Sequence, residues 1–112
     1  MHTPLFSKKD MILMDVSLSV GEFDPSADGA YRNVKTFPLE VMQGKELFVS
    51  VDSDAPVDIA ISGGDGMCII FRESILNGKL GPIAVRKKET MMLVIGVFRG
   101  DRAELKLKVW TE

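Results

Sequence analysis

Apolar and polar residues alternate in short runs along most of this 112-residue chain. In residues 10–20, for example, the apolar side chains of Ile12 and Val16 alternate with polar side chains such as Asp15. A period of two places neighbouring side chains on opposite faces of a β-strand. A helix would instead bring Asp15 onto the same face as Ile12. The pattern therefore predicts a half-buried strand.

Seven further runs carry the same kind of signal: residues 37–41, 47–52, 57–62, 67–71, 83–85, 91–98 and 105–109. Residues rich in Gly, Asp, Pro and Ser separate them, with turn signals at 43–45, 53–56, 63–66 and 99–101. No segment carries a long helical period. The sequence predicts an all-β fold, an antiparallel β-sandwich or jelly roll of about eight strands. We expect one domain over residues 1–112, with residues 1–9 as a disordered tail.

Several runs also predict where a strand lies in its sheet. Pro38 removes a backbone donor, so its strand is expected at an edge or a bulge. Residues 67–71 are apolar on both faces and are expected at the centre, and residues 91–98 in the most buried strand. We expect residues 21–35 to form a long loop, and residues 72–82 a loop with one helical turn.

The middle of the chain resembles small jelly-roll domains of the bacterial pre-peptidase C-terminal (PPC) type and the related GOLD-like sandwiches. The resemblance covers residues 36–110 and includes the closing run VFRGDRAELKLKVW. The matching residues are Phe37, Leu39, Gln43, Gly44, Leu47, Val49, Val51, Val57, Asp58 and Ile59. It implies a non-catalytic accessory or interaction module. Those families are mostly extracellular or lumenal and joined to other domains, whereas this sequence shows no signal peptide.

The composition of the chain argues against two classes of binding partner. The net charge is −2 and no basic stripe is visible, so a nucleic-acid partner is not expected. The longest apolar run, residues 91–98, is far below the roughly 20 residues of a membrane helix, so no membrane partner is expected. Cys68 is the only cysteine, which excludes an intrachain disulfide. A reducing, cytoplasmic location is therefore the prediction.

The sequence offers little catalytic chemistry. His2 is the only histidine and lies in the predicted tail, away from any partner for a nucleophile–base pair. Cys68 lies in an apolar strand, where cysteine behaves as a small hydrophobic residue. A carboxylate pair such as Asp52 and Asp58 has no supporting base or cofactor motif. We therefore predict a non-enzymatic protein without a cofactor.

Acidic residues in two segments are the candidates for a calcium site: Asp24, Asp28, Asp52, Asp54 and Asp58. The first segment begins like an EF-hand loop, but Lys35 stands where that loop requires a bidentate glutamate. The alternative interpretation is that these residues are solvated turn residues.

Some apolar residues fall on the side of a strand opposite to the predicted core: Phe48, Ile70, Met91, Leu93, Ile95 and Val97. One explanation is a bulge that switches the alternation. The other is a sheet face that packs on a second protein, and we favour self-association into a homo-oligomer. These six residues are therefore the predicted interaction surface.

Binding of a carbohydrate or another small ligand, with or without calcium, is the alternative function. It requires exposed aromatic residues, and the candidates are Phe23, Tyr31, Phe48 and Trp110.

Overall fold

The computed structural model describes residues 11–21, 31–98 and 102–112, which form one antiparallel sheet of six strands without a helix. The strands are β1 (Met11–Gly21), β2 (Tyr31–Val41), β3 (Glu46–Ser62), β4 (Cys68–Ala84), β5 (Glu89–Phe98) and β6 (Arg102–Thr111). The prediction of an all-β antiparallel fold is confirmed. The described residues contain six strands rather than eight, because β3 and β4 each join two of the predicted strands.

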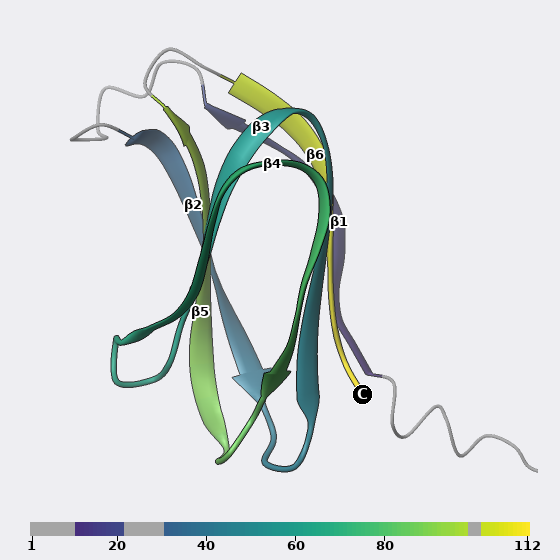
Figure 1. Cartoon of the computed structure of the whole chain (residues 1–112), viewed down its shortest axis with the longest axis vertical. Helices are drawn as coiled ribbons and strands as arrows, with labels where there is room; N and C mark the ends of the chain where they lie inside the picture. The colour runs from purple at the N-terminus through teal and green to yellow at the C-terminus, as the bar shows by residue number, and fades with distance from the viewer. Residues whose placement is uncertain (1–10, 22–30, 99–101) are drawn as a thin grey trace, which may run out of the picture.

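The long strands β3 and β4 run side by side and form an arch that curls the sheet over on itself (Figure 1). Residues 46–53 of β3 pair with β6, whereas residues 58–62 pair with β5. We call the "β6 half" the part made of β1, β6, residues 46–53 of β3 and residues 77–84 of β4. The "β5 half" consists of β2, β5, residues 57–62 of β3 and residues 68–75 of β4.

The bend of β3 lies where the sequence predicts a turn. Between the pairs Asp52–Asn77 and Val57–Ile75, β3 has more residues than β4, so it bulges outward. Ser53 stabilises the bulge, because its Oγ donates to the carbonyl of Ala55 at 2.5 Å. The turn signals at 53–56 therefore produce a bend inside a strand, and the prediction of a chain reversal there is wrong.

The structure also corrects the predicted position of β4. The prediction of a loop and helical turn at residues 72–82 is wrong, because these residues continue the ladder with β3. Residues 67–71 are not central, since β4 pairs with β3 alone among the described strands. The edge position of β2, which contains Pro38, is confirmed, and so is the burial of β5 between β2 and β3. The prediction of a loop at residues 21–35 is wrong at both ends, because Gly21 belongs to β1 and residues 31–35 belong to β2, while residues 22–30 lie outside the described residues.

The core fills the space between the two halves. Leu47, Val49 and Val51 face it from the β6 half, and Ile61 and Leu93 face it from the β5 half, each at most 2% exposed. Residues 77–84 of β4, in the β6 half, lie close to the neighbouring strand β3. Gly81 has a φ of 112°, and a Cβ there would stand 2.5 Å from the carbonyl oxygen of Leu47. Only glycine fits this approach without a shift of the backbone.

Candidate interaction surface

Four of the six predicted surface residues are in the core. Met91, Leu93, Ile95 and Val97 are at most 2% exposed. The predicted parity of β5 is therefore wrong, because these side chains face the β6 half across the core. The outward-facing residues of β5 are Met92 and Val94, which are half-buried.

The other two predicted residues are each partly covered. Ile70 lies on β4 opposite Ile61 and packs against the core from the edge of the sheet. Phe48 lies on the outer face of the β6 half and is 8% exposed, because Trp110 stacks on it with a centroid distance of 5.4 Å. Neither residue alone forms an accessible apolar surface.

The outer face of the β5 half is nevertheless apolar. One row across this face joins Val94 on β5 to Ala60 on β3 and then to Phe71 on β4. The neighbouring row joins Met92 to Ser62. Phe71 is 46% exposed, and none of these five side chains is charged. The described structure leaves this face open to solvent.

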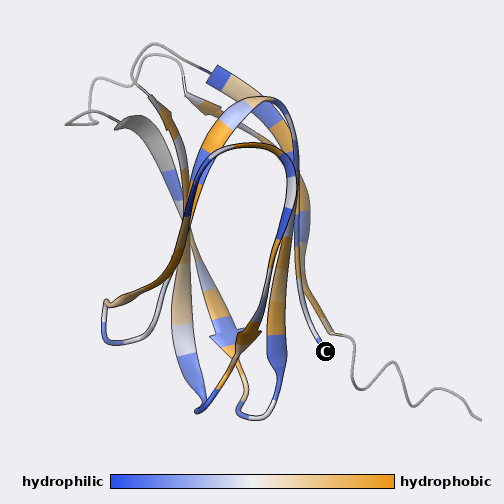
Figure 2. Cartoon of the chain, in the orientation of Figure 1, coloured by the Kyte–Doolittle hydropathy of each residue, from blue (hydrophilic) through white to orange (hydrophobic). Residues whose placement is uncertain are grey.

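The apolar face continues onto the free edge of β4. Half of the exposed large hydrophobic residues of the described chain lie on or beside this strand: Met67 at 69%, Ile69 at 45%, Phe71 at 46% and Leu76 at 45%. Figure 2 shows the lower part of this strand, next to the turn before it, in orange. Natural edge strands usually carry lysine, proline or another device against pairing. Residues 67–71 contain no lysine and no proline, and the one irregularity there is the shift of register with β3 at Ile69.

The basic residues at positions 86–88 lie outside the strands of the sheet. Arg86, Lys87 and Lys88 lie in the connection between β4 and β5. The edge of β4 at residues 68–71 therefore has no basic side chain of its own. We define the apolar surface by six residues: Met67 beside β4, Ile69, Phe71 and Leu76 on β4, and Met92 and Val94 on β5.

Sequence reasoning missed the apolar surface because it placed residues 67–71 at the centre of the sheet. The signal was present in the apolar residues on both parities of that run. Only the pairing of β4 with β3 alone shows that one edge and one face remain uncovered.

A cluster of aromatic and basic side chains lies on the outer face of the β6 half. The ammonium of Lys79 lies 4.9 Å from the ring centroid of Phe48, and that of Lys108 lies 5.5 Å from the ring of Trp110. The indole Nε1 of Trp110 donates to Glu112 at 2.8 Å. These contacts are cation–π pairs, which stabilise the stacked rings. They also cover Phe48, so of this stacked pair only Trp110 stays half-exposed as a platform for a ligand.

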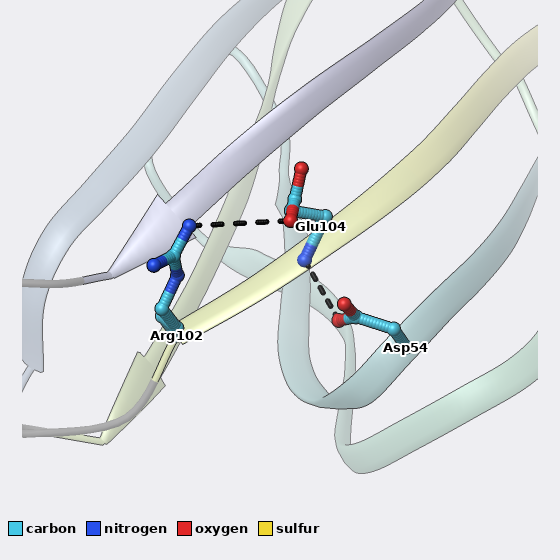
Figure 3. A network of polar contacts seen from close by, with 3 residues as sticks. All are labelled: Asp54, Arg102 and Glu104. Carbon is cyan, nitrogen blue, oxygen red and sulfur yellow. Dashed lines mark hydrogen bonds and ion pairs between the residues drawn. The ribbon is translucent and has the colours of Figure 1, made fainter.

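A polar pocket of about 460 Å³ lies at the end of the β6 half, near the bend of β3. It brings together Asp52 and Asp54, two of the predicted metal candidates, with Glu104 and Lys106. Asp54 accepts a hydrogen bond from the backbone nitrogen of Glu104 at 2.8 Å, and Arg102 lies 3.9 Å from the Glu104 carboxylate (Figure 3). This ion pair is exposed on both sides and contributes little to stability.

The structure does not bring the predicted metal ligands into one site. Asp58 is buried on the other half, where its Oδ1 accepts from the backbone nitrogen of Ser74 at 2.8 Å. Among the described residues, no group of three or more His, Cys, Asp and Glu side chains is arranged to hold a metal ion. The candidates Asp24 and Asp28, like His2, lie outside the described residues.

Three further candidate residues from the sequence are Cys68, Phe23 and Tyr31. Cys68 is exposed at the edge of β4 and not enclosed in an apolar strand as expected. Phe23 lies outside the described residues, and the side chain of Tyr31 is not described. The part of the chain that the structure describes contains no helix of sufficient length and hydrophobicity to cross a membrane.

No model of a known protein family matches this sequence, and a comparison with curated proteins gives no match. The resemblance to PPC-type and GOLD-like domains therefore remains a prediction from the sequence.

Proposed function

We propose that this protein is a non-enzymatic β-sandwich module that acts by protein–protein association, in the simplest case with a second copy of itself. The observation that supports this is the apolar surface, in which an apolar part of a sheet face continues onto an unpaired sheet edge. Exposed contiguous apolar patches on soluble proteins mark interaction sites. A free edge adds a row of backbone donors and acceptors that a partner strand can satisfy.

Phe71 is the best residue for testing this proposal, because it is outward-facing, 46% exposed and central to the apolar surface. We expect wild-type protein to sediment as a larger species as its concentration rises from about one to several hundred micromolar. The variant Phe71→Asp should remain monomeric over this range, because a desolvated carboxylate opposes association.

Ile12→Asp is the matched control, since Ile12 is 58% exposed on β1 of the β6 half. It should associate like the wild type. A wild-type protein that stays monomeric throughout would contradict self-association. Equal association of wild type and Phe71→Asp would instead show that another surface is used.

The polar pocket supports a second candidate, the binding of a small polar ligand such as a sugar. Its lining combines carboxylates, serines and Lys106, which can donate to and accept from hydroxyl groups. Calorimetric titration with a glycan panel tests it. Heat of binding that disappears in Asp52→Ala would support this function.

A further inference from the structure

The free edge of β4 carries a sequence that is complementary to itself in the antiparallel direction. From residue 69 to residue 76 the order is Ile-Ile-Phe-Arg followed by Glu-Ser-Ile-Leu. Three apolar residues begin the segment and two end it, with one basic and one acidic residue at the centre. When this segment meets an antiparallel second copy of itself, Ile69 lies opposite Leu76, Ile70 opposite Ile75 and Arg72 opposite Glu73, whereas Phe71 lies opposite Ser74.

We propose that two copies of this chain pair through their β4 edges, antiparallel, about a two-fold axis between Arg72 and Glu73. This inference rests on the proposed function and specifies its partner and register. Arg72 then lies opposite Glu73 of the second copy, and the symmetry repeats the pair. Neighbouring residues of a regular strand point to opposite faces, but the ladder of β4 has an irregular step between the pairs Ile59–Arg72 and Val57–Ile75, where Ser74 has a φ of 55°. The alternation of faces is therefore interrupted beside the axis. Isologous contacts of this type are the commonest in homodimers.

The faces of the strand agree with this register. Ile70 lies opposite buried Ile61, and Ile75 lies opposite buried Val57, so both face the core side of β4. The register pairs Ile70 with Ile75 of the second copy, which joins two residues of the same face as an antiparallel ladder requires.

The outer face agrees as well. Cys68 lies opposite Ser62 and Asn77 opposite Asp52, and both of these β3 residues face outward. The register places Cys68 opposite Asn77 of the second copy. A shift of two residues in either direction would set an outward residue against an inward one, at Cys68 against Ile75 or at Ile70 against Asn77.

The charges at the centre are available for this pairing. Arg72 and Glu73 are both exposed, and the guanidinium of Arg72 donates to the neighbouring carbonyl of Phe71 at 3.0 Å. In this register residues 69–75 of one copy lie opposite residues 70–76 of the other. The β5 halves of the two copies therefore lie edge to edge along one side of the arch of β4 (Figure 1).

The native cysteine provides a direct test of the register. Directly opposite residues of an antiparallel pair have Cα atoms about 4.5–5.5 Å apart, a separation that a disulfide spans. Asn77→Cys should therefore form two intermolecular disulfides with Cys68 under mild oxidation, giving a covalent dimer on non-reducing gels. Within one chain the two positions lie about 30 Å apart along the strand, which prevents an internal bond.

Lys106→Cys is the control, because Lys106 is exposed on β6 of the other half. It should give no rapid dimer, and neither should the wild type with Cys68 alone. If the wild type self-associates but Asn77→Cys is not crosslinked faster than this control, the register is wrong and the proposed function stands. If the wild type stays monomeric at every concentration, both fail.

A charge exchange tests the two-fold axis independently. Arg72→Glu should weaken dimerisation by about tenfold or more, since it sets two carboxylates against each other twice. The double variant Arg72→Glu with Glu73→Arg should recover to within about threefold of the wild type, because the exchanged charges again meet. Without recovery, the two residues do not face each other and the axis is wrong.

Discussion

The outer faces of the two halves differ in charge, although β3 and β4 contribute to both. On the β6 half, Lys108 pairs with Asp15 on one side and Ser50 on the other, and the next row repeats this alternation of charge and hydroxyl. On the β5 half, the corresponding row runs from Val94 to Ala60 and Phe71. The same architecture therefore presents one solvated face and one face suited to burial.

The difference shows that an outer face does not have to be polar for the fold to form. Each half needs only its inward residues to complete the core. The outward positions are therefore free to be polar on one half and apolar on the other.

The largest effect on the free energy of unfolding is expected in β5, where an inward-facing and an outward-facing residue can each be replaced by alanine. Met91 is 2% exposed and Met92 is half-buried on the apolar face. Met91→Ala should lower the free energy of unfolding by about 2–5 kcal/mol, because it leaves a cavity in the core. Met92→Ala should lower it by less than about 1 kcal/mol.

Urea denaturation of these two variants at low protein concentration measures both values. Equal losses would contradict the assignment of Met92 to a solvent-facing apolar surface.

An intermediate effect on stability is expected when either of two aspartates is replaced by alanine. Each accepts a backbone hydrogen bond, but one is buried and the other is exposed. Asp58 accepts from Ser74 at 2.8 Å in the β5 half and is buried, whereas Asp54 accepts from Glu104 at 2.8 Å and is exposed. Asp58→Ala should cost about 1–2 kcal/mol, because it leaves a partly buried backbone N–H unpaired. Asp54→Ala should cost about 0.5 kcal/mol, since water replaces the lost acceptor.

Thermal unfolding of Asp58→Ala and Asp54→Ala measures the two losses of stability. A cost for Asp54→Ala as large as that for Asp58→Ala would mean that the bend of β3 depends on the exposed bond.

The smallest effect on stability is expected from a substitution on the outer face of the β6 half. Lys79→Gln removes the cation from Phe48 and Trp110, whose centroids lie 4.9 and 5.6 Å from its Nζ. The loss should be about 0.5–1 kcal/mol, accompanied by a change in the fluorescence of Trp110. Lys106→Gln, which removes a charge from the same face, should leave the fluorescence unchanged.

The strand positions followed from the sequence because a period of two needs no knowledge of distant residues. The alternation identified β1, the inward side of β3 at Leu47 and Val49, and the closing strand that contains Leu107. The turn at Gln43 and Gly44 also followed from turn chemistry alone, since Gly44 has a φ of 89°.

The position of each strand in the sheet did not follow. Residues 67–71 are apolar on both faces for two different reasons, the core on one side and the apolar surface on the other. A buried central strand has the same composition. The bend at Ser53 and Ala55 was equally ambiguous, because the residues that reverse a chain also make a bulge in a continuing strand.

The surface residues predicted from the sequence do not coincide with the apolar surface of the structure. An excess of apolar residues on β5 indicated an interaction surface, yet parity assigned it to Leu93 and Ile95, which form the core. Parity counted from the sequence fails at each bulge, and the ladders of β1, β2 and β4 all contain irregular steps.

The place of β6 between β1 and β3 has a consequence for synthesis. Of the described strands, β6 is the last to leave the ribosome, and it supplies the hydrogen-bonded neighbour of two strands made much earlier. Until it emerges, the nascent β6 half lacks its middle strand, and the apolar side chains of β3 lack a cover. The whole sheet can therefore form only after β6 has emerged, and a chaperone that shields β3 would be of greatest use before then.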